Sequence, residues 1–275
     1  MPKNQNWTGE RLETFIFNET TIEHLHRYAI AKEFVKGKTV LDIACGEGYG
    51  TSLLADEALS VKGVDIDSSV IEKAKRKYTK PNLNFLLGST EQIPFVDQSF
   101  EVVTSFETIE HTSEHEKMMS EIKRVLKPNG LLIISTPDKL NYADKRNHRS
   151  PFHIKELYSE QFHELISMYF TYHIFMRQLY TNASVITSDN PGMVKMYKGN
   201  FEEITVTNLP DSLYLIAFAS DKPVEISGFS IFDGGPTLDD ALRQREHIVR
   251  NTLTYRTGHL LLLPLKFIIK LFRKL

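Results

Sequence analysis

The sequence predicts a doubly wound α/β domain, with a mostly parallel sheet covered by helices on both faces. Three observations support this class. Short apolar runs alternate with amphipathic helix patterns through most of the chain. The first run, residues 39–43, breaks into a turn with glycines at positions 46, 48 and 50. A helix pattern follows at residue 51, and this strand–turn–helix context raises the glycine pattern above chance.

Size and composition limit the classes of protein that remain. The chain has 275 residues, 41% of them hydrophobic, and a net charge of −2, which suits one α/β domain with extensions and gives no case for nucleic-acid binding. Its single cysteine, Cys45, excludes an internal disulfide and indicates a reducing, cytoplasmic compartment. We expect no signal peptide, because the first residues lack an apolar segment. No run reaches the ~18–20 apolar residues of a spanning helix.

The glycine turn and two aspartates mark a ligand site. Gly46-x-Gly48-x-Gly50 differs from the G-x-G-x-x-G dinucleotide fingerprint. Glycine accepts backbone angles closed to other residues and lets a ligand approach the main chain. Asp42 lies at the end of the first strand, and Asp65 follows a second apolar strand, residues 59–64. A carboxylate at the second position can accept both ribose hydroxyls of a nucleoside lying over the turn.

The remaining elements follow in order along the chain. An N-terminal helix is expected to begin with a capping box of Thr20 and Glu23 and to end at Gly37. Ser68 is expected to cap the helix after the second strand. Residues 138–158 and 181–211 lack periodicity and are expected to be irregular. Further strands are predicted at 83–87, 100–105, 131–135, 172–179 and 212–219, and further helices at 113–126, 159–169 and 237–256.

Together these motifs resemble the class I S-adenosylmethionine-dependent methyltransferases, over roughly residues 36–137. The resemblance implies a Rossmann-like, mostly parallel, seven-stranded sheet with an antiparallel edge strand. It implies S-adenosyl-L-methionine as the cofactor and S-adenosyl-L-homocysteine as its product. It also divides the chain into an N-terminal helical lid (1–36), a methyltransferase domain (37–220) and a C-terminal amphipathic helical tail (221–275).

The resemblance carries a set of cofactor-binding residues onto this sequence. Arg11 is expected to pair with the cofactor's carboxylate, with a surface arginine as the alternative. Related families often place Asp after the glycine of the third strand, where this chain has Ser89, so the adenine contact would depend on a weaker hydroxyl acceptor and on backbone groups. The set is Arg11, Asp42, Ala44, Gly46, Gly48, Gly50, Asp65, Ile66, Ser89, Thr90, Glu91, Phe106 and Glu107.

Catalytic candidates come from the chemistry of methyl transfer. The protein mainly aligns the acceptor with the methyl group, and a hydroxyl acceptor of high pKa also needs a general base. His111 and His153 are the candidates. Tyr28, His148 and Glu156 are expected to contact the acceptor, with a polar surface loop as the alternative reading of residues 147–157. Glu107, Glu110 and Asp138 show no ligand spacing, so we predict no metal site.

Three hypotheses describe the function. Residues 9–11, 23–28 and 147–157 resemble bacterial methyltransferases encoded with glycan-assembly genes, which implies O-methylation of a sugar or glycan intermediate in polysaccharide biosynthesis. The core motifs also resemble quinone-pathway methyltransferases, which keeps a lipophilic acceptor open. The third hypothesis is a non-catalytic nucleoside-binding scaffold, and the intact glycine set with Asp65 argues against it.

The tail, residues 258–275, has a basic side and an apolar side when projected on a helix. This is the pattern of a helix lying in a membrane interface. We therefore expect contact with an anionic membrane surface and a peripheral location on the inner face. A dimerisation helix, and hence a homodimer, or a helix docked on the core is the alternative.

Overall fold

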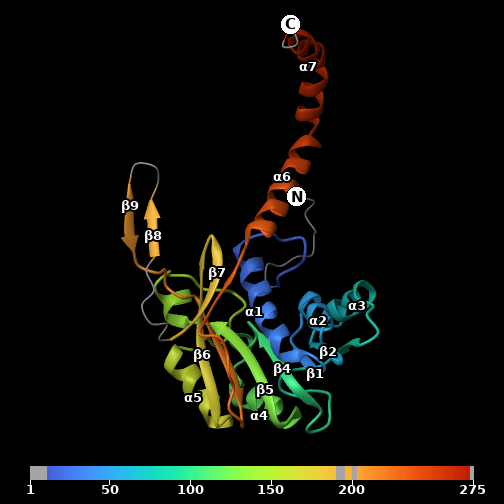
Figure 1. The fold of residues 1–275 in the computed structure, drawn as a ribbon. Helices are drawn as coiled ribbons and strands as arrows, with labels where there is room; N and C mark the ends of the chain where they lie inside the picture. The colour runs from blue at the N-terminus through green and yellow to red at the C-terminus, as the bar shows by residue number, and fades with distance from the viewer. Residues whose placement is uncertain (1–10, 190–195, 200–202, 273–275) are drawn as a thin grey trace.

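A nine-stranded sheet forms the centre of the computed structural model, within the residues that it describes, 11–189, 196–199 and 203–272 (Figure 1). The strand order is β11-β7-β6-β10-β5-β4-β1-β2-β3. The strands are β1 (Thr39–Ile43), β2 (Ser60–Asp65), β3 (Leu83–Leu87), β4 (Phe100–Phe106), β5 (Leu126–Pro137), β6 (Tyr172–Thr181), β7 (Ala183–Ser188), β10 (Tyr214–Ser220) and β11 (Phe229–Phe232).

One half of the sheet is parallel. Strands β3, β2, β1, β4 and β5 pair in parallel, with Val40 opposite both Val61 and Val102. The carboxyl ends of these strands therefore meet at one edge, where ligands bind in doubly wound sheets. The Rossmann-like, mostly parallel fold predicted from the sequence is confirmed.

The other half is antiparallel and larger than predicted. β10 lies between β5 and β6 and is antiparallel to both. β7 and β11 then extend the sheet, so the expected number of seven strands was wrong. β7 falls in a stretch expected to be irregular. It forms because Asn182, with φ of 45°, turns the chain back and residues 183–188 pair with β6.

Helices cover both faces of the sheet, as the sequence predicts. α1 (Glu19–Val35) and α2 (Tyr49–Leu54) cover one face and bury Val40. α4 (His115–Val125) and α5 (Ser159–Tyr169) cover the other and bury Leu41 and Ile43. Adjacent residues of β1 thus enter opposite cores, because side chains alternate along a strand. α3 (Ser68–Lys77) packs beside β3, and the short helices η1 (Ile109–His111) and η2 (Leu140–Asp144) follow β4 and β5.

Two predicted helix caps were wrong. α1 is capped by Asn18, whose side chain accepts from the Thr21 backbone N–H, so Thr20 and Glu23 do not form the box. α3 is capped by Asp67, whose carboxylate accepts from the N–H groups of residues 69 and 70. In both helices the side-chain oxygen that reaches the first unpaired N–H groups belongs to a neighbouring position.

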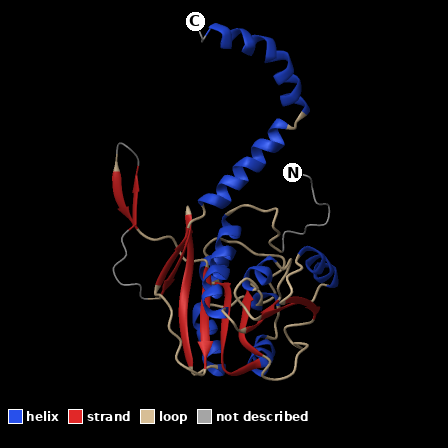
Figure 2. Ribbon diagram, turned by 45° about the vertical axis from the view of Figure 1, so that its right-hand side comes forward, coloured by secondary structure: helices blue, strands red, loops and turns tan. Residues whose placement is uncertain are grey.

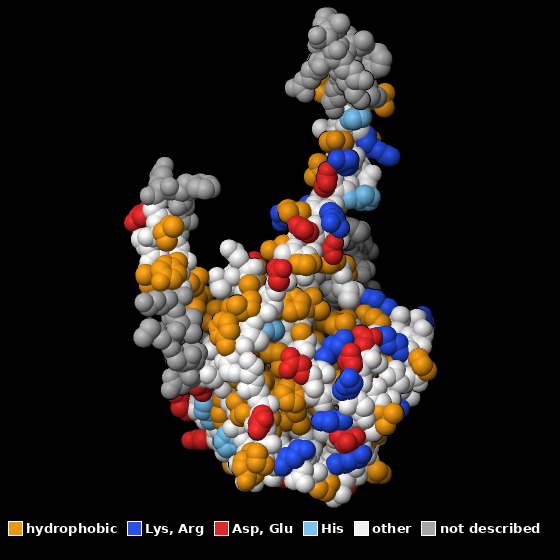
Figure 3. All heavy atoms as spheres, in the orientation of Figure 1, with side chains coloured by type: hydrophobic (Ala, Val, Ile, Leu, Met, Phe, Trp, Pro, Cys, Tyr) orange, Lys and Arg blue, Asp and Glu red, His pale blue; other side chains and the backbone are white. Residues whose placement is uncertain are grey.

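The C-terminal helices leave the body of the domain (Figures 1 and 2). They are α6 (Gly235–Arg250) and α7 (Leu253–Phe272), separated at residues 251–252, so the single helix predicted over residues 237–256 was wrong. A separate hairpin, β8 (Met196–Gly199) with β9 (Ile204–Thr207), also projects. Leu253, Leu260 and Leu261 are exposed, and Figure 3 shows apolar and basic side chains together along the described part of the tail. Among the described residues, no helix is both long and apolar enough to cross a membrane.

Candidate active site

A cavity of about 610 Å³ lies at the carboxyl ends of the parallel strands. Residues that follow β1 to β5 line it, and the segment before α1 closes it from the other side. The cavity contains most of the residues predicted from the sequence: Arg11, Tyr28, Ala44, Gly46, Asp65, Ile66, Ser89, Thr90, Glu91, Phe106, Glu107, His111 and His153.

The turn after β1 presents its backbone to this cavity. Ala44 and Gly46 have φ of 59° and 53°, in the left-handed region. A Cβ built on Gly46 would meet nothing closer than the Arg11 Cδ at 4.0 Å, so the position faces open space. The Gly46 N–H donates to the Asp65 carboxylate over 2.9 Å. Gly46 therefore fits the prediction that a ligand approaches the main chain at this turn.

Gly48 and Gly50 have a different role from the one expected. Neither lines the cavity. A Cβ on Gly50 would lie 1.9 Å from Cζ of Tyr28, and one on Gly48 would lie 2.7 Å from the ring of Phe85. Both positions need glycine because aromatic rings pack directly on the backbone. They shape the turn, and they do not form a surface for the cofactor.

Asp42 also lies beneath the cavity instead of facing it. Its carboxylate is 1% exposed and accepts hydrogen bonds from Thr51 and Thr104, each over 2.7 Å, and from the Tyr28 hydroxyl. Burial raises the pKa of Asp42 to about 6. Asp42 does not line the cavity, because the hydroxyls of Thr104 on β4 and Thr51 on α2 hold its side chain under the turn; its cofactor contact stays a prediction. Asp42 instead fixes the ring of Tyr28, which does line the cavity.

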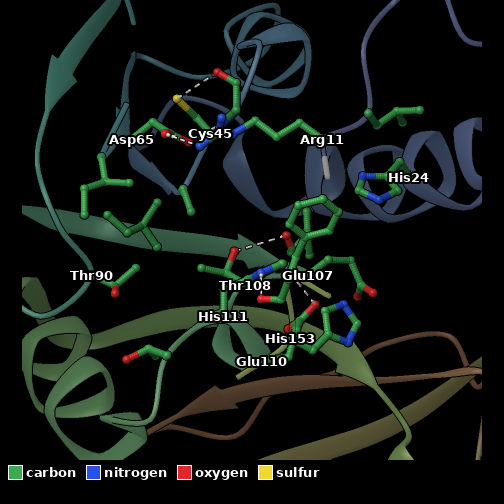
Figure 4. A pocket seen from close by; sticks show the side chains of 18 of the residues that line it. Arg11, His24, Cys45, Asp65, Thr90, Glu107, Thr108, Glu110, His111 and His153 are labelled. Atoms are coloured by element: carbon green, nitrogen blue, oxygen red, sulfur yellow. Dashed lines mark hydrogen bonds and ion pairs between the residues drawn. The ribbon is translucent and has the colours of Figure 1, made fainter. Parts of the chain in front are cut away.

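Asp65 and Arg11 meet across the cavity floor. One oxygen of Asp65 accepts from Gly46, and the other accepts from the backbone N–H of Asp67. Arg11 lies 3.5 Å from Asp65 and 3.0 Å from Asp67, and Figure 4 shows Arg11 and Asp65 on the same side of the cavity. The guanidinium thus pairs with these carboxylates in the structure, whereas the sequence suggested a pairing with the cofactor's carboxylate. Thr14 holds the same segment to Glu47 of the glycine turn over 3.0 Å.

The loop after β3 forms the neighbouring wall. The Ser89 hydroxyl accepts from the N–H of Glu91 over 3.1 Å, so its proton points away and can be donated. Glu91 accepts from Thr112 over 2.9 Å. Ile66 is 71% exposed beside this wall, an apolar side chain that a ligand ring could cover. Ser89 lines the cavity, and its contact with the adenine edge stays a prediction.

A buried arginine holds Glu107 at the end of β4. Glu107 has φ of 52°, and its carboxylate accepts from the Ser135 hydroxyl over 2.6 Å. Arg27 of α1 is fully buried and lies 3.2 Å from the same carboxylate. Its Nε donates to Gln178 over 2.7 Å, and its guanidinium stacks over the ring of Tyr214 at 4.4 Å. Sequence reasoning missed Arg27, because nothing in an amphipathic helix pattern marks a buried cation.

The predicted catalytic histidines come together at the far end of the cavity. The rings of His111 and His153 are 5.2 Å apart, centroid to centroid. His153 Nδ1 lies 2.5 Å from Glu156, and His111 Nδ1 lies 3.0 Å from the Phe152 carbonyl. Glu110 is buried beside them, and desolvation together with the nearby Glu107 raises the pKa of Glu110 well above its usual value. Glu156 thus orients His153, as predicted.

A second cavity of about 530 Å³ adjoins the first. The two share Ser150, His153 and Ile154 as lining residues. His148 and Glu156, both predicted to contact the acceptor, line the second cavity and not the first. Most of its other walls are polar or charged, including Lys139, Asp144, Asn147, Arg149 and Lys155. His153 therefore stands at the junction between two compartments.

Some lining residues had no signal in the sequence. His24 and Tyr49 hydrogen-bond to each other over 2.9 Å, and Tyr142 stacks on His153 with a ring separation of 5.7 Å. Tyr214 completes the wall behind them. These side chains come from α1, α2, η2 and β10. For Glu110, the sequence signal that could have placed it in the site was its position directly before His111.

Comparison with known proteins shows what the chain is similar to. Residues 41–134 match a family model described as a methyltransferase domain. A probable S-adenosylmethionine-dependent methyltransferase of Mycolicibacterium smegmatis is 36% identical over 60% of this chain and 65% of its own length. A phthiotriol/phenolphthiotriol dimycocerosates methyltransferase of Mycobacterium ulcerans is 31% identical over 46% and 51%. A crystal structure from Thermotoga maritima, titled as a SAM-dependent methyltransferase and possible histamine N-methyltransferase, shares the fold, with a TM-score of 0.54, 18% identity and coverage of 74% and 90%.

The matched part of the chain, residues 41–134, is thus similar to S-adenosylmethionine-dependent methyltransferases, as the sequence resemblance implies. The chain spans about half to two thirds of the length of the curated relatives that it matches first. The family's cofactor is S-adenosylmethionine. The family model covers β1 to β5 and stops before η2. His153, Glu156 and the other residues that line the second cavity therefore lie outside the matched region.

The cavity has room for S-adenosylmethionine. Its volume is within the usual range of small-molecule sites. Gly46 leaves the space above the turn open, and Asp65 holds a carboxylate at the end of β2. Each oxygen of Asp65 accepts one backbone N–H, which leaves lone pairs for ribose hydroxyls. Ribose binding would bring those hydroxyls to the carboxylate that Arg11 now pairs with.

Proposed function

We propose that the protein transfers the methyl group of S-adenosylmethionine to a hydroxyl of a polar, sugar-like acceptor. The observation that carries this proposal is the position of His153. It lies at the junction of the cofactor-sized cavity and the polar second cavity, and Glu156 holds its ring. A histidine so placed can take a proton from a hydroxyl that enters from one compartment and faces the other.

The cofactor residues divide into contacts and supports in this proposal. Gly46 and Asp65 lie where the cofactor binds, and the wall from Ser89 to Glu91 lies at its adenine end. Bound S-adenosylmethionine supplies an electrophilic methyl group and a neutral leaving group. Asp42, Gly48 and Gly50 support the turn and the ring of Tyr28. The segment before α1, latched by Arg11 and Thr14, acts as a lid.

His153 acts as the general base that takes the proton of the acceptor hydroxyl. Its Nδ1–H donates to Glu156, so Nε2 carries the lone pair that accepts the hydroxyl proton. The carboxylate of Glu156 stabilises the imidazolium that forms. His111 lies edge to face with His153 and is anchored by a backbone carbonyl. It therefore positions the acceptor, and its Nε2 lies 3.9 Å from a Glu110 oxygen.

The charged and amide side chains among those that line the second cavity support a sugar or glycan intermediate as the acceptor. These side chains can bind several hydroxyl groups, whereas a lipophilic acceptor would leave them without partners. A lipophilic acceptor is the second candidate, supported by the exposed leucines of the tail and by the name of the Mycobacterium ulcerans relative. Measuring the release of S-adenosylhomocysteine with sugar, nucleotide-sugar and quinone acceptors distinguishes the sugar acceptor from the lipophilic one. Turnover with quinones alone would contradict the sugar proposal.

Replacing Asp65 with Ala should weaken S-adenosylmethionine binding by about 1–3 kcal/mol, the cost of losing hydrogen bonds to a charged group. This corresponds to a rise in Kd of about 5- to 150-fold, measured by isothermal titration calorimetry. Asp67→Asn is the matched control, because Asp67 pairs with the same Arg11 but lies outside the cavity lining. Equal losses in both variants, or no binding by the unaltered protein, would contradict the proposed cofactor site.

We also propose that the tail holds the protein at an anionic membrane surface. Leu253, Leu260 and Leu261 of α7 are exposed, which argues against docking of that part on the core. The basic residues of the predicted amphipathic face, Lys266, Lys270, Arg273 and Lys274, have side chains outside the described residues. Changing all four to Glu should abolish flotation with anionic vesicles, because phosphate attraction becomes repulsion. Charge reversal at Lys73, Lys75 and Arg76 of α3 is the control, and equal loss there would contradict a role specific to the tail.

A further inference from the structure

Glu110, His111 and His153 bring three atoms that can bind a metal into one place. One carboxylate oxygen and one nitrogen of each imidazole lie within 4.8 Å of one another. Figure 4 shows the three side chains gathered on the side of the cavity opposite Asp65 and Arg11. Glu110 is buried and the histidines are partly exposed, so the group faces the cavity from a protein wall. Two imidazoles and one carboxylate are a ligand set typical of zinc and iron(II) sites.

Both rings are already oriented as metal ligands are. His111 Nδ1 faces the Phe152 carbonyl and His153 Nδ1 faces Glu156, and each acceptor requires Nδ1 to carry the hydrogen. The lone pair is then on Nε2, and His111 Nε2 lies 3.9 Å from a Glu110 oxygen. Metal-binding histidines almost always donate their other N–H to a carboxylate or a carbonyl in this way. These outward hydrogen bonds are an observation independent of the clustering itself.

The wall is held in place from both sides. The Glu110 backbone carbonyl accepts from the N–H groups of Ile154 and Lys155, over 2.8 and 3.1 Å. These bonds dock the loop that carries His153 onto η1, which carries His111. The Glu110 carboxylate accepts from Thr136 of β5 over 3.3 Å. Two ligand atoms of a tetrahedral ion with bond lengths of ~2.1 Å lie ~3.4 Å apart. The ligand atoms of Glu110, His111 and His153, which lie within 4.8 Å of one another, therefore need to approach by about 1 Å to bind an ion.

We propose that Glu110, His111 and His153 bind a divalent transition-metal ion of the zinc type at the acceptor end of the cavity. The sequence alone pointed to no metal site, because the spacing of these residues along the chain matches no ligand motif. Three protein ligands leave a coordination position open toward the cavity, which is the arrangement of catalytic rather than structural zinc sites.

The role of the ion depends on the proposed methyl transfer, whereas the binding of the ion to the three side chains does not. An ion on Nε2 of His153 occupies the lone pair that otherwise accepts the proton. The ion then lowers the pKa of an acceptor hydroxyl at its open position, and the hydroxyl proton leaves to solvent. The substrate class implied is an alcohol whose oxygen takes the one open position, such as a hydroxyl of a sugar.

The test is titration of the untagged full chain, stripped with a chelator, with Zn²⁺ by calorimetry and with Co²⁺ by visible absorption. We expect one ion per chain and the intense visible bands of four-coordinate Co²⁺. Glu156→Gln, which removes an outer hydrogen-bond partner, should weaken binding about 10–100-fold. Glu110→Gln and His153→Ala, which remove ligands, should weaken it more. His247→Ala, on the exposed tail helix, should leave the affinity unchanged.

Binding of S-adenosylmethionine is measured on the same samples. It shows that each variant is folded, and it tests the methyltransferase proposal separately from the metal site. Cofactor binding without Co²⁺ bands would overturn the metal site and leave the methyltransferase proposal standing. Co²⁺ bands without cofactor binding would do the opposite. Equal weakening by His247→Ala and by the ligand variants would also overturn the site, because the bound ion would then lie elsewhere.

Discussion

His153→Ala should lower turnover by about 10²–10⁴-fold, the usual contribution of a positioned general base, while the affinity for S-adenosylmethionine stays close to that of the unaltered protein. The reason is its position between the two cavities and its hydrogen bond to Glu156. Turnover falls whether Nε2 takes the proton or holds an ion. The measurement is release of S-adenosylhomocysteine with an acceptor that supports turnover, alongside calorimetry with the cofactor.

His163→Ala is the matched control for this experiment. That histidine lies on α5 and stacks on Phe175 at a ring separation of 3.7 Å, outside both cavities. Its replacement should leave the turnover number unchanged. A loss of cofactor affinity in His153→Ala as large as the loss of turnover would assign His153 to cofactor binding. No change in either quantity would move the base to another residue.

Arg27→Met should lower the free energy of unfolding by about 3–5 kcal/mol, the cost of removing one partner of a buried ion pair. Arg27 is the only cation that we find within 4.0 Å of the Glu107 carboxylate among the described residues. It also binds Gln178 and packs against Tyr214. Its loss leaves Glu107 beside Glu23 and Glu110, two buried carboxyl groups whose pKa values are already raised, to about 7 in Glu23. Chemical denaturation measures the change.

A second substitution and a surface control sharpen this prediction. Arg27→Met with Glu107→Gln should recover much of the lost stability, because the unpaired charge is removed. Lys32→Met lies on the same helix and breaks an exposed pair with Asp56, 3.4 Å long, so it should cost less than about 1 kcal/mol. Similar losses of unfolding free energy from Arg27→Met and Lys32→Met would show that the buried ion pair stabilises the protein no more than the exposed one.

The end of the cavity formed by β1 and β2 could be predicted because its residues are close together in the sequence. The turn from Ala44 to Gly46 directly follows β1, and Asp65 ends β2. Parallel pairing of β1 with β2 then brings them to one edge. Local periodicity is enough to place such residues, since each one is defined by the strand that it terminates.

The direction of side chains could not be predicted in the same way. Asp42 and Gly50 belong to the glycine motif, yet they face Thr104 and the ring of Tyr28 below the turn. Which face of a turn meets a ligand depends on what covers the other face. Here that is α1, an element whose position relative to β1 no local pattern specifies.

The fold class and the positions of the parallel strands along the chain could be read from the sequence, because both depend on short-range periodicity and on residues at strand ends. The cluster of Glu110, His111 and His153 forms only in the tertiary structure. Glu110 follows β4, His153 lies in the loop after β5, and backbone hydrogen bonds between them bring the two together. Arg27 reaches Glu107 from α1 for the same reason. Side chains from elements far apart in the sequence meet only once packing has fixed the distances between those elements.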